Sequence, residues 1–225
     1  MTIDTTAARL PVLNWTRPYR RIKEAESLAD AIKTLRGDDP RPLLIQWEGE
    51  GELKDAPARQ KTARATFSGH DTFLLAPFFQ CYQIDREELG KDHPLRKLFK
   101  KGLDVHAVAF SNDGKVVEPI TKLKNKNVLK AMSKVFKHDY GQGATPTVKK
   151  LKKYAKSMAK IDGEVTKLKG EIAVALEKKK DRVASKLEKE IEGLEADRKE
   201  LEEQEQEVYD LELERKEPTP VVAKG

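Results

Sequence analysis

The chain has 225 residues, a formal net charge of +6, and more charged and fewer hydrophobic residues than an ordinary globular domain. This balance predicts one domain of ordinary size with a charged extension, rather than a single large core. The single cysteine, Cys81, excludes an intramolecular disulfide, and no stretch approaches the roughly 18 apolar residues of a membrane span. Because the N-terminus also has no apolar signal region, we expect a cytoplasmic protein.

Strands and helices alternate in the pattern of the first 140 residues. Residues 1–14 are expected to be a flexible N-terminus. Leu28, Ala31, Ile32 and Leu35 have helical spacing and Gly37 follows them, which predicts a helix over 27–36. The other predicted elements, in chain order, are an edge strand within 14–22, a buried strand at 42–47, a helix at 56–67, a strand in the second half of 73–85, a helix at 94–100, strands at 105–110 and 115–119, and a helix at 128–136.

The last two strands are separated by Ser111-Asn112-Asp113-Gly114. An Asn-Asp-Gly sequence between two β-rich runs is a strong signal for a β-hairpin. Alternating strand and helix units that end in an antiparallel hairpin predict the α/β class, with a mixed sheet covered by helices. We expect this domain to span residues 15–142.

Three segments carry a resemblance to a known family. They are the strand 43–47, the strand end Gln83-Ile84-Asp85, and the stretch 101–116 that contains the Asn-Asp-Gly turn. In their order and spacing they resemble the thioredoxin-like family over roughly residues 14–140. There they correspond to the strand before the active site, the strand that ends in Asp, and the hairpin strands. The resemblance implies a thioredoxin-like fold, and a fold by itself does not carry a function.

The chain departs from that family where its chemistry lies. Gly51-Glu52-Leu53-Lys54 stands in place of the redox Cys-x-x-Cys, and Val105-His106 stands in place of the facing cis-proline. Thiol–disulfide exchange needs an attacking thiolate and a nearby resolving thiol. The resemblance therefore implies the scaffold without its redox chemistry. We expect no enzymatic activity, no cofactor and no metal site, and we predict that a protein partner docks near Trp47, Glu52 and His106.

The region from Thr145 onward has a heptad pattern. Thr145 followed by Pro146 is a typical helix start, and no further proline occurs before Pro218. Apolar residues recur every seven positions, which predicts a coiled coil over 146–215 and a flexible tail over 216–225. The predicted first seam consists of Leu151, Met158, Val165 and Ile172, with Tyr154, Ile161, Leu168 and Ala175 three places later. A second seam consists of Leu187, Leu194, Leu201 and Val208, with Ala184 and Ile191 three places before the first two, and the polar residues Arg198 and Glu205 at the later positions of that row.

Charge divides this region into two halves. Residues 146–180 contain eleven lysines and four acidic residues, whereas residues 181–215 contain six basic and fourteen acidic residues. A parallel homodimer would place like charges together, so we expect antiparallel pairing. Two arrangements stay open: a helical hairpin that turns near residues 178–181, and an antiparallel dimer of unbroken helices. The absence of Gly, Pro and Asn from 177–182 favours an unbroken helix.

Together these patterns predict a non-catalytic scaffold or adaptor, whose domain docks a partner and whose arm sets spacing or oligomerises. One alternative is nucleic-acid binding by basic residues next to aromatic ones. Another is thiol chemistry at Cys81, although a lone strand cysteine among aromatic residues is usually part of a core. The basic residues beside Trp15 and Tyr19 are Arg17, Arg20, Arg21 and Lys23.

Overall fold

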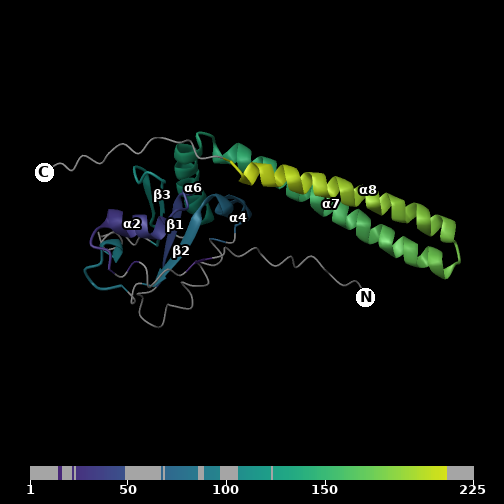
Figure 1. Cartoon of the computed structure of the whole chain (residues 1–225), viewed down its shortest axis with the longest axis horizontal. Coiled ribbons are helices and arrows are strands. Elements are labelled where there is room, and N and C mark those ends of the chain that lie inside the picture. Colours follow the sequence, from purple (N-terminus) through teal and green to yellow (C-terminus); the bar gives the residue numbers. More distant parts are fainter. Residues whose placement is uncertain are drawn as a thin grey trace. The chain divides into compact units, whose positions relative to one another are not determined.

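The computed structural model describes residues 15–16, 22, 24–48, 67, 69–85, 89–96, 106–122 and 124–211 (Figure 1). They fall into two compact units: the first ends at Ala144, and the second is Thr145–Leu211. Within the described residues, no helix combines the length and the apolar character needed to cross a membrane.

A four-stranded mixed sheet forms the centre of the first unit. Its strands are β1 (Leu43–Glu48), β2 (Gln80–Asp85), β3 (Ala107–Phe110) and β4 (Val117–Ile120), in the order β2-β1-β3-β4. The central strand β1 runs parallel to β2 and antiparallel to β3, and β4 is antiparallel to β3. Beyond β2, Thr16 makes an isolated parallel bridge to Tyr82. The predicted α/β class with a mixed sheet is confirmed.

Helix α2 (Leu28–Arg36) covers one face of the sheet. The Ser27 side chain accepts a hydrogen bond from the Asp30 amide at 3.0 Å, and this cap starts the helix. Gly37 ends it with a φ of 56°, in the left-handed region that favours glycine. The helix therefore has the ends that the sequence predicted. The core on this face joins helix and strand residues, among them Ala31, Ile32, Leu35, Leu43, Ile45, Val108 and Phe110.

Three helical segments lie on the other face: α4 (His70–Leu75), the short 3₁₀ helix Ala76–Phe78, and α6 (Asn125–Tyr140). Helix α6 contacts β3, β4 and α4. Leu44 points to this side because successive strand residues face opposite ways. The rings of Phe136 and Tyr140 meet the Phe78 ring edge-on, with centroids 5.0 and 5.6 Å away. Both faces of the sheet are thus covered, which explains why β1 is buried from Leu43 to Gln46.

The β3–β4 hairpin closes as the sequence predicted. The Ser111 amide donates to the Val116 carbonyl at 2.9 Å, and the Gly114 amide donates to the Ser111 carbonyl at 3.0 Å. Helix α6 is longer than the predicted 128–136, and Gly141 follows it with a φ of 67°. Most of the predicted edge strand at 14–22 and helix at 56–67, and the end of the helix at 94–100, lie outside the described residues.

The second unit is formed by two long helices, α7 (Ala144–Glu177) and α8 (Asp181–Tyr209). Helix α7 begins one residue before Thr145, the predicted cap. Residues 178–180 separate the helices, and Lys179 has a φ of 53°. The expectation of an unbroken helix is therefore wrong in the single chain. It assumed that a turn would use Gly, Pro or Asn, whereas a lysine adopts the left-handed conformation here at a modest steric cost.

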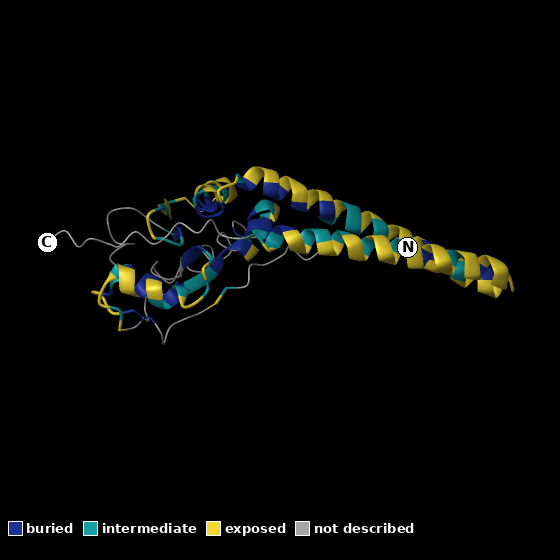
Figure 2. Cartoon of the chain, turned by 45° about the horizontal axis from the view of Figure 1, so that its top comes forward, coloured by how far each residue is buried: buried dark blue, intermediate teal, exposed yellow. Residues whose placement is uncertain are grey.

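Helices α7 and α8 run antiparallel, side by side (Figure 1). Asp162 on α7 pairs with Arg198 on α8 at 2.8 Å, and Lys169 pairs with Glu195 at 4.0 Å. We refer to this pair of helices as the arm. The predicted seam residues are buried or half-buried, whereas most other arm residues are exposed (Figure 2). The buried members of the heptad pattern are Leu151, Tyr154, Leu168, Ala175, Ala184, Ile191 and Val208; Met158, Ile161, Val165, Ile172, Leu187, Leu194 and Leu201 are half-buried.

Candidate functional site

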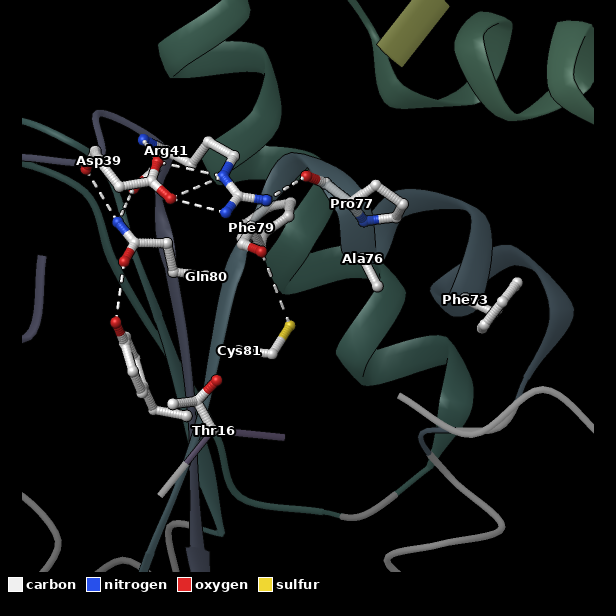
Figure 3. Close-up of a pocket in the computed structure, with 10 residues that line it drawn as sticks. Thr16, Asp39, Arg41, Phe73, Ala76, Pro77, Phe79, Gln80 and Cys81 are labelled. Atoms are coloured by element: carbon white, nitrogen blue, oxygen red, sulfur yellow. Dashed lines mark hydrogen bonds and ion pairs between the residues drawn. The ribbon is translucent and has the colours of Figure 1, made fainter. Parts of the chain in front are cut away.

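The first unit contains a pocket of about 450 Å³ (Figure 3). It lies where β1 and β2 begin, because Arg41 just precedes β1 and Gln80 is the first residue of β2. Aromatic rings of Phe73 and Phe79 contribute to its wall, together with the side chain of Cys81. Its chemistry depends on whether the charged and nucleophilic groups here are free to act on a ligand.

Arg41 is held by protein groups. Its Nη2 lies 2.6 Å from Asp39 Oδ2, its Nε donates to the same carboxylate, and its Nη1 donates to the Pro77 carbonyl at 2.8 Å. Burial opposes ionisation of Asp39, but the hydrogen bonds from Arg41 outweigh it and lower the pKa of Asp39. The two charges therefore compensate each other, and the pocket does not present a lone cation to an anionic ligand.

Gln80 and Tyr82 also have structural partners. Gln80 Nε2 donates to the Asp39 carbonyl at 2.9 Å, and the Tyr82 hydroxyl donates to the Leu35 carbonyl at 2.7 Å. These bonds tie the start of β2 to the end of α2 and to the segment that leads into β1. The polar groups of the pocket thus hold the chain together at this edge of the sheet.

Cys81 is not activated as a nucleophile. Burial raises the pKa of its thiol to about 12, and the nearby charge of Arg41 only partly opposes this effect. Its Sγ lies 4.0 Å from the Phe79 carbonyl. Since the thiolate is the reactive form, a thiol with such a high pKa is nearly inert at neutral pH.

A second group of ionisable residues joins the β3–β4 turn to the end of α6. Asp113 lies in the turn, and His138 and Asp139 lie in the last helical turn of α6. The His138 Nε2 is 3.1 Å from each carboxylate oxygen of Asp113 and 3.9 Å from Asp139 Oδ1. Each residue offers one possible ligand atom within 4.8 Å of the others, so these described residues form a group that has the geometry to hold a metal ion.

Hydrogen bonds to Asp113 and Asp139 hold the β3–β4 turn in place and join it to the end of α6. Lys115 N and Ser111 Oγ donate to Asp113, and Asn112 N donates to Asp139 at 2.8 Å. Burial disfavours ionisation of Asp113, but the hydrogen bonds from Lys115 and Ser111, together with His138, outweigh burial and lower the pKa of Asp113. In Asp139, burial dominates and raises the pKa to about 6.

Arg36 completes the cluster from the other face of the sheet. Its Nη2 donates to the Ser111 carbonyl at 3.1 Å, and its charge acts on both Asp113 and Asp139. Because the carboxylates already accept backbone hydrogen bonds and face an arginine, we interpret the group as a clamp between turn and helix. This clamp was not predicted from the sequence. The adjacent His138-Asp139 pair in a helix that follows an Asp-containing turn was the available signal.

Two of the three predicted docking residues, Trp47 and His106, are found at the opposite end of β1 from the pocket. Trp47 is in β1, and the His106 amide, just before β3, donates to the Ile120 carbonyl at 2.9 Å. Gln46 pairs with Ala107, so the next step of this antiparallel register places Trp47 opposite His106. In α/β sheets, ligands usually bind beyond the carboxyl ends of the parallel strands, which is this end of β1. Glu52 lies outside the described residues.

The residues predicted as nucleic-acid contacts, Arg17, Arg20, Arg21 and Lys23, also lie outside the described part of the chain. Comparison of the chain with protein-family models, with curated proteins and with solved structures gave no match. The function is therefore inferred from the geometry and chemistry of the chain itself.

Proposed function

We propose that this protein is a non-catalytic adaptor with two working parts: a thioredoxin-like domain that docks a protein partner, and a coiled-coil arm. The observation that carries the proposal is the pairing of α7 with α8. The arm covers its own seam within one chain and leaves the outer surfaces of two oppositely charged helices exposed. Helix α7 has 34 residues, which corresponds to a reach of about 51 Å.

The topology of the first unit supports a thioredoxin-like domain. The strand order β2-β1-β3-β4, with one parallel and two antiparallel pairs, is the arrangement that the family resemblance implies. Helix α2 covers one face and α4 with α6 the other. Thr16 also makes an isolated parallel bridge to Tyr82 of β2.

The state of Cys81 argues against the redox alternative. It is the one cysteine of the chain, so no second thiol can resolve a mixed disulfide within the molecule. Its high pKa removes the thiolate that exchange requires. It lies in β2, near the start of that strand and away from the carboxyl end of β1 where the family's active site is found. A thioredoxin-like domain without this thiol chemistry would keep the binding surface of the fold and would not carry out disulfide exchange.

The proposed docking surface is the carboxyl end of β1, where Trp47 and His106 each lie one residue beyond the last pair of the β1–β3 register, with Glu52 a few residues further along the chain. Tryptophan is enriched among the residues that dominate protein–protein binding energy. His106 is half-buried and adds a group with both donor and acceptor capacity. These features fit a protein partner better than a small-molecule substrate.

Photo-crosslinking tests the docking surface directly. A photoreactive amino acid replaces His106 in the full chain, and in a matched control it replaces Lys33, which is exposed on α2. Both proteins are irradiated in the source cells, and the products are identified by mass spectrometry. The proposal predicts a defined protein adduct at position 106 that is absent at position 33. Equal adducts at both positions, or none at 106, would contradict it.

A further inference from the structure

The outward face of α7 carries a continuous row of lysines. With Leu151 assigned to heptad position a, positions b, c and f point away from α8. All residues at these positions between Lys149 and Lys167 are exposed. The lysines among them are Lys149, Lys152, Lys153, Lys156, Lys160 and Lys167, and we refer to these six residues as the lysine stripe.

The remaining residues of this face do not offset its charge. They are the small residues Ala159, Gly163 and Thr166, and a Cβ added to Gly163 would meet no atom within 4 Å. The two acidic residues of α7 in this range, Asp162 and Glu164, occupy positions e and g at the border with α8. Asp162 is paired with Arg198 there. Between Lys149 and Lys167, positions b, c and f thus contain only lysines and small uncharged residues.

The stripe is long enough to span several phosphates of a regular anionic polymer. Lys149 and Lys167 are 18 residues apart, which corresponds to about 27 Å of helix, and Lys153, Lys160 and Lys167 follow at intervals of about 10.5 Å. A length of about 27 Å equals the rise of roughly eight base pairs of a duplex. Lys167 is paired with Glu171 at 3.6 Å, but such an exposed pair contributes little and exchanges easily.

We infer that the lysine stripe binds the phosphate backbone of a nucleic-acid duplex, without reading its sequence. Single-strand binding uses exposed aromatic rings for stacking, whereas the aromatic residue of α7, Tyr154, is 9% exposed. In-plane membrane binding requires an apolar face. The apolar residues of α7 are used in the seam, and the exposed Val174 and Leu176 lie beyond the stripe. A row of lysines with no exposed apolar side chains among them is suited to contacts with the repeated phosphates of a nucleic-acid backbone.

This inference assigns a partner to the arm and rests on the proposed function only in treating the arm as a binding element. The outward face of α8 provides a matched control. It also carries three lysines, Lys186, Lys189 and Lys199, but they are interspersed with glutamates. A binding mode that depends on net charge alone would respond equally to the loss of three lysines from either helix.

The experiment measures fluorescence anisotropy of a labelled mixed-sequence DNA duplex of about 20 base pairs with the full chain, over a series of salt concentrations. The test variant is Lys153→Gln, Lys156→Gln and Lys160→Gln; the control is Lys186→Gln, Lys189→Gln and Lys199→Gln. We expect the test variant to lose at least about tenfold in affinity at low salt. Its log–log salt slope should fall in magnitude by about 2 to 3, since each phosphate contact contributes roughly 0.9.

The control variant should bind within about twofold of the unaltered chain, and arginine at the three α7 positions should preserve binding because it keeps the charge. Circular dichroism verifies that each variant keeps its helices. Equal losses in both glutamine variants, or no effect of the α7 variant, would overturn the inference. So would absence of duplex binding, whether or not anionic lipid vesicles bind. None of these outcomes alters the crosslinking result at position 106, so the two proposals fail separately.

Discussion

Asp162 and Arg198 are 36 residues apart in the chain, and their side chains form an ion pair of 2.8 Å between α7 and α8. Arg198 stands at a seam position, and its Nη1 also pairs with Glu202, one turn further along α8. The positive charge thus lies between two carboxylates. Together with the pair Lys169–Glu195, this contact shows the antiparallel alignment that the opposite charges of the two helices favour.

Charge reversal tests this alignment. Arg198→Glu places a third carboxylate beside Asp162 and Glu202, so we expect it to lower the melting temperature of the arm by a few degrees at low salt. Adding Asp162→Lys to that variant should recover part of the loss. Circular dichroism at the helical band measures both, and about 1 M salt should shrink the differences. A further drop in the double variant would contradict the alignment.

Burial along α7 predicts unequal effects of two identical substitutions. Leu168 is 9% exposed in the seam, and Leu176 is 52% exposed near the turn. Leu168→Ala should lower the free energy of unfolding by about 2 kcal/mol or more, because it leaves a cavity between the helices. Leu176→Ala should change it by less than about 0.5 kcal/mol. Urea titration followed by helical signal measures both. Equal losses would show that the seam is assigned to the wrong face.

The Cys81 thiol should be nearly unreactive in the folded protein. Because its pKa rises from 9.0 to about 12, the thiolate at pH 8 is about 1000-fold scarcer than in the unfolded chain. We expect an aromatic disulfide reagent to modify the native protein at least about tenfold more slowly than the protein in denaturant, since the greater nucleophilicity of a high-pKa thiolate offsets only part of its scarcity. Native labelling at a rate close to the denatured one would reopen the redox alternative.

Asp139 gives the clamp a defined pH dependence. Its folded pKa of about 6 exceeds the ordinary value of 3.8, so the folded state holds this proton more tightly than the unfolded state. The stabilisation from protonated Asp139 is therefore complete below about pH 4 and is lost as the pH rises through 6. Asp113, whose pKa is lowered, acts in the opposite sense and only under more acidic conditions.

Asp139→Asn isolates this effect. The amide oxygen can still accept the Asn112 amide hydrogen, while the titration is removed. We expect the stability of the unaltered chain relative to the variant to fall between pH 4 and pH 6 and to be constant above about pH 7. Denaturant titrations at several pH values provide the comparison. A difference that rises over that range would contradict the assignment.

Several elements could be predicted because their determinants are local. Helix α2 begins at the Ser27 cap and ends at Gly37, and the β3–β4 turn depends on residues 111–114. The heptad spacing identified which residues of the arm are shielded from solvent. A turn near residues 178–181 was one of two arrangements that the sequence left open, and the residues around it pointed the other way. Local sequence could not decide between them, because the steric cost of the turn at Lys179 is offset by the pairing of two long helices along the whole arm.

The candidate sites also differ in whether their residues could be related from the sequence or only from the folded structure. Trp47 and His106 were expected near one another, and in the structure each follows or precedes by one residue the last pair of the β1–β3 register, Gln46 and Ala107. The clamp could not be found in this way, because Asp113 and His138 are 25 residues apart and meet only when α6 folds across the hairpin. The lysine stripe required the heptad assignment together with the burial of each residue, since composition alone shows only that this half of the arm is basic.

The central claim is that the arm closes on itself within one chain and is therefore free to bind another molecule. Light scattering of the full chain at several protein concentrations tests it most directly. The account predicts a mass of 25.5 kDa that does not change with concentration. A mass near twice that value, converted to the single-chain mass by the seam substitution Leu168→Ala, would show instead that the helices pair between two chains, and would contradict the account.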